Sequence, residues 1–372
     1  MLHSIALTFL RGITQGQALE LLRHLPSIQL LFDSPDEALS ELHPQARLRI
    51  SAALREHRSE ALERAAAEVE FCERHGIAVL PITSAAYPQR LAECPDAPAV
   101  LYYRGTACWD VQHVLSIVGT RRITPYGKDI CQQLVGELAQ RLPDVLIVSG
   151  LAYGVDVHAH RACLAHGVST VGVLAHGLDQ IYPSSHRETA KAMLNNGGLL
   201  TEYARGTRPL AGHFVRRNRI VAGLSDATIV VESADKGGAL ITARLASDYH
   251  RLVAAFPGRV GDPYSVGCNR LIREQNAALI TSAADLLDVL GWASPATTTP
   301  AVQLDLFPTL NAEQQRVVDA LRATDGLSVA QLCVRTNLEQ SVLHAQLFEL
   351  EMSGVVQLLA GGLYRLLPQV HP

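Results

Sequence analysis

The sequence predicts an α/β fold built around a doubly wound parallel sheet, and two observations favour this fold class. First, one pattern recurs five or six times along the middle of the chain: a short apolar segment, a turn of small or basic residues, and then an amphipathic segment. Second, apolar segments such as residues 114–118 and 145–148 show no polar alternation, which is typical of strands covered on both faces. Strands and helices that alternate in this way form doubly wound sheets.

The elements of this central domain follow in chain order. Strands are expected at residues 77–82, 98–105, 114–118, 145–148, 170–174, 199–202, 228–232 and 252–256. One expected helix opens at Pro125 and runs to about residue 141, since proline is favoured in a first turn. Another spans residues 213–225, where Ile220, Val221 and Leu224 recur at helical spacing.

The first 75 residues predict a small helical module. Residues 2–54 read as short helical pieces, and residues 58–75 as a longer charged helix that ends at Gly76. The sequence L-R-G-I-T at residues 10–14 is similar to a helix-hairpin-helix turn, but the second glycine is not where that motif has it. We expect a module of the SAM or helix-hairpin-helix type that serves mainly to pack.

The composition changes again after residue 291. Residues 292–309 are rich in proline, threonine and alanine and predict a linker. Residues 310–372 then show three helical segments and a strand pair around Gly361 and Gly362. This order is typical of a winged helix, so we expect domains at residues 1–75, 76–291 and 310–372.

The composition limits the classes of function that the chain can have. The chain has 372 residues, is 48% hydrophobic and carries a net charge of −4, so it has no overall basic field and any anion binding must be local. Its seven cysteines form no C-x-x-C pair, which favours reduced thiols in a cytoplasmic protein over a structural zinc. No apolar run reaches about 18 residues, so we expect no membrane span, and the N-terminus has no pattern of an export signal.

The stretch between Glu202 and Asp226 concentrates positive charge. It has no acidic residue but five arginines: Arg205, Arg208, Arg216, Arg217 and Arg219. Such a cluster repels itself unless negative charge balances it. Two interpretations stay open: the arginines bind an anionic ligand, or they pair with carboxylates from elsewhere in the chain.

The turns after the strands favour the anionic ligand. In a doubly wound sheet these turns share the carboxyl edge of the strands, where ligands bind. The groups expected to converge there are Gly119 to Arg121, Ser149 with Gly150 and Gly154, Arg216 with Arg217, Asn218 and Arg219, and Lys236 with its two following glycines. Glycine turns at helix N-termini offer N–H groups and arginine offers bidentate contacts, so phosphate is the natural ligand. The alternative is that the glycines serve tight turns alone.

No cofactor and no metal are expected. The fingerprint G-x-G-x-x-G is missing after the first strand of the sheet, and G-x-x-x-x-G-K-[ST] does not occur, which argues against NAD and ATP. His158 and His160 lie two positions apart and share no helical face. Asp156 is expected to cap the helix or hold its turn, and His176 and His186 are interpreted as ordinary loop residues.

Eight motifs occur in fixed order between about residues 81 and 290. They read P-A-V-L-Y-Y-R-G, I-V-G-T-R-R-x-x-x-Y-G, S-G-L-A-Y-G-V-D-x-x-A-H, G-L-D-x-x-Y-P, F-x-R-R-N-R-I-x-x-G-L-S, V-V-E-S-x-x-K-G-G-A-L-I-T-A, A-F-P-G and G-C-N-R-L-I. In this order they resemble the DNA-processing protein A (DprA/Smf) family, and the match is highly specific.

The resemblance implies a Rossmann-like domain that binds single-stranded DNA and forms homodimers. It also implies that the protein brings a RecA-type recombinase onto incoming strands in natural transformation, without catalytic turnover. By motif, the DNA contacts would be Arg121, the turn from Gly150 to Gly154, Phe214, Arg216 to Arg219, and Lys236. Two positions depart from the pattern: Val215, where many members have proline, and Val155, where isoleucine is usual.

An enzyme is the alternative. Phosphoribohydrolases of the related Rossmann group split nucleoside monophosphates and show P-G-G-x-G-T-x-x-E after a corresponding strand. Here residues 236–243 read K-G-G-A-L-I-T-A, with no glutamate to act as a general acid or to steady an oxocarbenium-like transition state. We therefore expect a binding protein.

Overall fold

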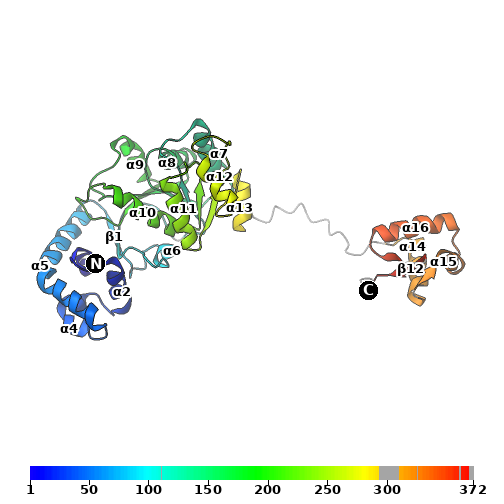
Figure 1. The fold of residues 1–372 in the computed structure, drawn as a ribbon, viewed down its shortest axis with the longest axis horizontal. Helices are drawn as coiled ribbons and strands as arrows, with labels where there is room; N and C mark the ends of the chain where they lie inside the picture. Colours follow the sequence, from blue (N-terminus) through cyan, green and yellow to red (C-terminus); the bar gives the residue numbers. More distant parts are fainter. Residues whose placement is uncertain (110, 293–309, 325, 360–361, 368–372) are drawn as a thin grey trace. The chain divides into compact units, whose positions relative to one another are not determined.

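The computed structural model describes residues 1–109, 111–292, 310–324, 326–359 and 362–367. The chain divides into two compact units, Met1–Ala293 and Ser294–Pro372, which are described separately (Figure 1). The predicted linker, residues 292–309, lies outside the described residues except for Trp292. The larger unit therefore contains both the predicted helical module and the predicted sheet domain.

A nine-stranded sheet forms the centre of the larger unit. Its strands are β1 (Ala78–Pro81), β2 (Val100–Gly105), β3 (Val114–Val118), β4 (Leu146–Ser149), β5 (Ser169–Val173), β6 (Gly197–Thr201), β7 (Ala227–Val230), β8 (Leu252–Ala255) and β9 (Ala278–Leu279). They lie in the order β1-β2-β6-β5-β4-β3-β7-β8-β9. Neighbours from β6 to β9 are parallel, whereas β1 and β2 add an antiparallel edge.

This strand order confirms the predicted doubly wound sheet. The chain moves outward from β3 through β4 and β5 to β6, and then returns to continue from β7 on the other side of β3. The direction of winding therefore reverses between β3 and β7. The crevice at the carboxyl ends of these two strands is the place where such sheets bind ligands.

Helices cover both faces of the sheet (Figure 1). One face packs against α6 (Gln89–Ala92), α10 (Ala211–Leu224), α11 (Gly238–Asp248) and α12 (Val266–Arg273), and the other against α7 (Pro125–Arg141), α8 (Val155–His166) and α13 (Ala283–Leu290). Side chains of β3 alternate between the two cores, with Val114 and Val118 in the first and Leu115 and Ile117 in the second. A short turn η1 (Ser184–His186) and α9 (Arg187–Met193) complete the layer over β5 and β6.

The first residues form a helical module, as predicted, but its last helix is longer than expected. The helices are α1 (Leu2–Phe9), α2 (Gln15–His24), α3 (Gln29–Asp33), α4 (Pro35–Ala38) and α5 (Pro44–Arg74). Residues 58–75 were expected to form a separate helix, whereas α5 begins at Pro44 because that proline occupies its first turn and His43 accepts the first N–H. The module's core includes Val100 and Tyr102 of β2, so it is continuous with the sheet.

The smaller unit is a winged helix, as predicted. Its elements are α14 (Ala312–Ala323), β10 (Leu327–Ser328), α15 (Val329–Thr336), α16 (Gln340–Met352), β11 (Val356–Leu359) and β12 (Leu363–Leu366). The strands form a three-stranded sheet in the order β10-β12-β11. Leu343, Leu347 and Leu350 of α16 are buried in a separate core of this unit. Among the described helices of both units, none has the length and apolarity that a membrane span requires.

Candidate nucleic-acid interface

A cavity of about 590 Å³ opens at the carboxyl edge of the sheet, where the winding reverses. Residues from five segments that are distant in sequence line it. The sequence-predicted residues among them are Gly119 and Arg121 after β3, Gly150 after β4, Phe214, Arg217 and Asn218 on α10, and Lys236 after β7. The structure therefore brings these seven residues together around one concave surface.

The exposed cations of this cavity have no carboxylate partner among the described residues. Arg121 and Lys236 are exposed, as is Arg122, which the sequence interpretation did not single out although it is adjacent to Arg121. Within the part of the chain that the structure describes, none of the three forms an ion pair, whereas Arg205, Arg216 and Arg219 do. Unpaired positive charge around a cavity favours an anionic ligand.

Aromatic rings lie beside these cations. The guanidinium carbon of Arg121 is 5.4 Å from the centroid of the Phe214 ring, and the Tyr182 ring lies 5.8 Å from the same ring. Tyr182 lines the cavity and is 48% exposed. The sequence interpretation missed Tyr182, treating it only as the residue before a helix, although it belongs to the motif G-L-D-x-x-Y-P. Rings beside cations can stack a base while the cations hold its phosphates.

One of the predicted glycine turns provides open backbone donors. The helix α11 begins after Gly237 without a side-chain cap, and Gly237, Gly238 and Ala239 all line the cavity. Its first N–H groups and the positive end of its dipole therefore face this space. In contrast, Thr124 caps α7, since its hydroxyl accepts a hydrogen bond from the N–H of Gly127 at 3.3 Å.

Ser149 and Gly154 do not line the cavity, in contrast to the prediction. Ser149 is completely buried, and its hydroxyl donates to the carbonyl of Ile117 at 2.6 Å. Gly154 has φ +80°, and a Cβ there would lie 2.0 Å from the carbonyl oxygen of Thr120. Both residues instead hold the turns after β3 and β4 against each other. For Gly154 this agrees with the alternative that the glycines serve tight turns and do not contact a ligand.

Arg217 lies beneath the cavity. It is 3% exposed, and Nη1 donates to the carbonyl oxygens of Gly150 and Val173. Asp156 lies nearby and accepts from the N–H of Ala152 at 3.4 Å, which agrees with its predicted role in holding the turn. Burial raises the pKa of Asp156 and lowers the pKa of Arg217, while their opposite charges oppose both shifts. The guanidinium of Arg217 is therefore engaged beneath the cavity and is not available to bind a ligand.

Arg216 and Arg219 do not line this cavity, although the sequence prediction grouped them with residues that do. Arg219 Nη2 lies 2.5 Å from Oε2 of Glu202, and both side chains are 7% exposed. Arg216 bonds to Oε1 of Gln15 and lies 3.6 Å from Glu202 Oε2. These two arginines therefore pair with a carboxylate, as the alternative interpretation expects. Arg205 does the same, since it lies 3.6 Å from Glu68.

The histidines and carboxylates near the site have structural partners. His176 and His186 were expected to be ordinary loop residues, but both are buried, and each Nδ1 is 2.9 Å from a backbone carbonyl oxygen. The carboxylate of Glu232 accepts from the N–H and the hydroxyl of Thr124 at 2.9 and 2.5 Å. In the described parts of the chain, no group of histidine, cysteine and acidic side chains has the arrangement of a metal site.

Comparisons with known proteins show the family to which the chain is similar. Residues 78–291 match the family model described as DNA recombination-mediator protein A, and residues 295–362 match the DprA winged helix domain. The chain is 36% identical to a putative DNA processing protein DprA of Mycobacterium tuberculosis over 72% of this chain and 69% of that protein. It is 34% identical to Protein Smf of Escherichia coli over 79% of this chain and 78% of that protein.

Two solved structures share the fold. DNA processing protein A from Streptococcus pneumoniae aligns with a TM-score of 0.65 at 31% identity, covering 77% of this chain and 97% of that one. DNA processing protein A from Helicobacter pylori, whose structure is described as giving insight into a single-stranded DNA binding mode, aligns with a TM-score of 0.52 at 32% identity over 57% of this chain and 95% of that one. With the ordered motifs, the doubly wound sheet and both family-model matches, the chain belongs to the DNA-processing protein A (DprA/Smf) family.

Proposed function

We propose that the chain binds single-stranded DNA in the cavity at the carboxyl edge of the sheet and acts as a mediator without catalytic turnover. The observation that carries this proposal is the set of exposed, unpaired cations, Arg121, Arg122 and Lys236, around a cavity that Phe214 and Tyr182 also line. Cations bind the phosphates of any sequence, and rings stack bases that are not paired. The Helicobacter pylori relative, named for its single-stranded DNA binding mode, supports the same ligand.

A single strand fits this site better than a duplex does. The aromatic rings line a cavity, and a base must be unstacked to pack against them, which a single strand supplies without the cost of opening a duplex. The open N–H groups at the start of α11 add phosphate contacts that do not depend on sequence. The proposed site therefore prefers single-stranded to double-stranded DNA and binds it largely independently of base sequence.

The acidic side chains near the cavity support a binding role over the phosphoribohydrolase alternative. A general acid needs a carboxyl group that reaches the ligand. Asp156 is 8% exposed and holds the turn after β4, and Glu232 is 3% exposed and is engaged by Thr124. Neither carboxylate is free to serve as the missing glutamate of that motif.

The proposal includes two protein partners and a location. A RecA-type recombinase is the proposed receiver of the strand in natural transformation or recombination, supported by the description of the family as a recombination mediator. A second copy of this chain is the other proposed partner, supported by the open strand edge at β9, where Leu279 is 51% exposed. The seven cysteines are free thiols, which supports a reducing, cytoplasmic compartment.

The proposed interface is tested by removing its two best-placed cations. The double variant Arg121→Gln/Lys236→Gln is expected to bind a labelled oligo-dT at least about tenfold more weakly, and to lower the log–log salt slope by about 1.4, since each lost phosphate contact removes about 0.7. Fluorescence anisotropy across a salt series measures both quantities. Phe214→Leu is expected to weaken binding without changing the slope, because stacking releases no counterion.

Arg141→Gln is the matched control. Arg141 is an exposed arginine in the last turn of α7, at the opposite end of that helix from the cavity. Like each of the two substitutions in the double variant, it removes one positive charge from the same unit, and it is expected to leave affinity and slope close to those of the wild type. A folded double variant that retained wild-type affinity would place the DNA elsewhere.

The winged helix is expected to contribute little to this binding. Its third helix, α16, carries Glu349 and Glu351 and no lysine or arginine, whereas a helix that reads a groove normally presents basic or amide side chains. On its surface, Phe348 is 65% and Met352 74% exposed, which supports a protein as the partner of this helix.

Removal of all residues after Trp292 is therefore expected to leave single-strand affinity within about threefold, a change below about 0.7 kcal/mol. The same anisotropy titration measures it, with circular dichroism as the check that the remaining unit is folded. A loss of most of the affinity in a folded truncated protein would show that the winged helix binds the strand despite its charge.

A further inference from the structure

Glu232 lies just after β7 and forms hydrogen bonds to both ends of the turn that follows β3. Its backbone carbonyl accepts from the N–H of Thr120 at 2.7 Å, and its carboxylate accepts from the N–H and the hydroxyl of Thr124 at 2.9 and 2.5 Å. Arg121 and Arg122, two exposed cations of the proposed DNA interface, lie between these threonines in sequence. One buried residue therefore fixes the backbone on either side of both arginines.

The carboxylate of Glu232 also packs closely against the first turn of α7. Glu232 is 3% exposed, and a Cβ added at Gly127 would overlap its Oε2. The hydroxyl of Thr124 donates to Glu232 and accepts from the N–H of Gly127 at 3.3 Å. The carboxylate therefore lies at the positive end of the α7 dipole, where a negative charge is stabilised.

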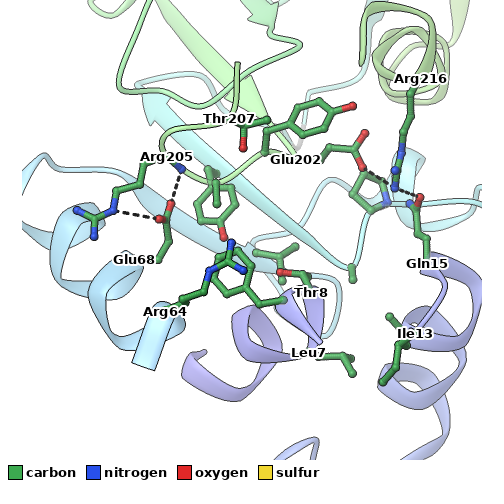
Figure 2. Close-up of a pocket in the computed structure, with 18 of the residues that line it drawn as sticks. Leu7, Thr8, Ile13, Gln15, Arg64, Glu68, Glu202, Arg205, Thr207 and Arg216 are labelled. Atoms are coloured by element: carbon green, nitrogen blue, oxygen red, sulfur yellow. Dashed lines mark hydrogen bonds and ion pairs between the residues drawn. The ribbon is translucent and has the colours of Figure 1, made fainter. Parts of the chain in front are cut away.

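Glu232 differs from two other buried glutamates in having no cationic partner. The side chains of Glu68 and Glu202 are 5% and 7% exposed, and each faces an arginine, Arg205 and Arg216 respectively (Figure 2). Among the described residues Glu232 forms no ion pair, and its carboxylate is held by the N–H and O–H donors of the turn. An unpaired charge is costly to bury, so stability alone favours a neutral residue at this position.

The same residue also relates the two arginines to Lys236. Glu232 and Lys236 both belong to the turn after β7, and β7 is the neighbour of β3 in the sheet. The N–H of Ser233 donates to the carbonyl of Tyr264 at 2.7 Å, which joins this turn to the turn after β8. The exposed cations of the cavity are thus carried by two turns that Glu232 connects.

We propose that Glu232 is a positioning residue of the DNA interface, which holds Arg121 and Arg122 where they meet phosphates of the strand. The inference rests on the proposed function, because Glu232 acts through the arginines of that interface. Side chains that are held in place before the ligand arrives bind it more tightly, since less freedom is lost on binding.

Charge alone predicts the opposite effect of replacing this residue. Glu232→Gln removes a negative charge next to Ser233, which lines the cavity, and a more positive site attracts a polyanion more strongly. Positioning predicts weaker binding, because glutamine places an NH₂ group against one of the two donors of Thr124 and releases the turn. The direction of the change therefore distinguishes the two effects.

Glu232→Gln is expected to weaken binding of oligo-dT about fivefold or more, since both arginines must then be ordered on binding. It is also expected to lower the log–log salt slope, because an arginine that no longer meets its phosphate releases no counterion. Fluorescence anisotropy of the full chain across a salt series measures both quantities. Urea denaturation establishes that the variant is folded.

A double-mutant cycle shows whether Glu232 acts through the arginines. In the background Arg121→Gln/Arg122→Gln, Glu232→Gln is expected to have no further effect on affinity. Asp226→Asn is the matched control, since the Asp226 carboxylate accepts from the N–H of Val114 at 2.9 Å at the opposite end of the same pair of strands. It is expected to lower stability and to leave affinity and salt slope unchanged.

Thr124→Val and Thr124→Ser test the other side of the contact. Valine removes the hydroxyl that donates to Glu232, whereas serine retains it. Thr124→Val is expected to weaken binding of oligo-dT, and Thr124→Ser to bind it like the wild type; this pair decides the question if Glu232→Gln does not fold. Without DNA, hydrogen exchange is expected to be faster at residues 119–124 in Glu232→Gln than in the wild type.

Two results would overturn the inference and leave the proposed function intact. The first is a folded Glu232→Gln protein that binds oligo-dT as tightly as the wild type or more tightly, while Arg121→Gln/Arg122→Gln binds it weakly. The second is an equal loss of affinity from Glu232→Gln with and without the two arginines. Wild-type affinity of the double arginine variant would overturn both the inference and the assignment of these arginines to the interface.

Discussion

Replacing Arg219 with alanine is expected to lower the free energy of unfolding of the larger unit by about 3–5 kcal/mol, the cost of breaking a buried ion pair from one side. The Arg219 guanidinium and the Glu202 carboxylate are 2.5 Å apart, and both side chains are 7% exposed. Burial raises the pKa of Glu202, and the charge of Arg219 works against that shift. Without Arg219, the buried carboxylate loses its nearest cation and retains only the half-exposed Arg216, 3.6 Å away. Urea denaturation followed by tryptophan fluorescence measures the loss.

Arg216 provides the comparison for this prediction. It approaches the same carboxylate at 3.6 Å, but its side chain is 49% exposed, so Arg216→Ala is expected to cost at most about 1 kcal/mol. The double variant Arg219→Met/Glu202→Leu is expected to regain most of the lost stability, since it removes both charges and keeps much of the volume. An Arg219→Ala protein with wild-type stability and reduced DNA affinity would instead restore Arg219 to the interface.

Gly154→Ala is expected to cost at least about 3 kcal/mol and to weaken single-strand binding together with stability. The glycine has φ +80° and ψ −129°, and an added Cβ would lie 2.0 Å from the carbonyl oxygen of Thr120 and 2.7 Å from the backbone of Arg121. Relief of this overlap requires the turn after β3 to move, and that turn carries Gly119 and Arg121 into the cavity. Chemical denaturation and the oligo-dT titration together measure the two effects.

The variant Gly167→Ala distinguishes the cost of a positive φ angle from the cost of a steric overlap with a neighbouring backbone. Gly167 ends α8 with φ +71°, and a Cβ there would meet nothing within 4 Å. Its replacement is expected to cost only about 1 kcal/mol, the usual penalty of a left-handed residue with a side chain. Equal costs for the two variants would mean that the contact with Thr120 is easily relieved, and that Gly154 serves the turn by its dihedral angles alone.

The elements of the sheet were predictable because their signals are local. The expected strand at residues 114–118 and the helix opening at Pro125 coincide with β3 and α7, since apolar continuity and a proline in a first turn act over a few residues. The winding then places the turns after β3, β4 and β7 at one edge by topology alone. This is why the sequence alone predicts that Gly119, Arg121, Gly150 and Lys236 lie together.

The roles of the arginines on α10 were not predictable from their spacing. Arg216, Arg217 and Arg219 are nearly adjacent in sequence, but successive residues of a helix point about 100° apart, so small differences in its rotation decide which one faces the cavity. That rotation depends on Ile220, Val221 and Leu224 packing against the sheet. The partner of Arg219 is Glu202, which lies before the helix and is buried only once the chain has folded.

The continuity between the helical module and the antiparallel edge of the sheet has a consequence for synthesis on the ribosome. The helices α1 to α5 emerge before β2, but their core includes Val100 and Tyr102 of β2, and β2 in turn pairs with β6, where Tyr102 lies opposite Thr201. The interval between the emergence of β2 and of β6 is on the order of 10 s at ordinary rates of translation. During that time the helices α1 to α5 and β2 have an incomplete core and an unpaired strand edge, which are the kinds of surface that chaperones protect.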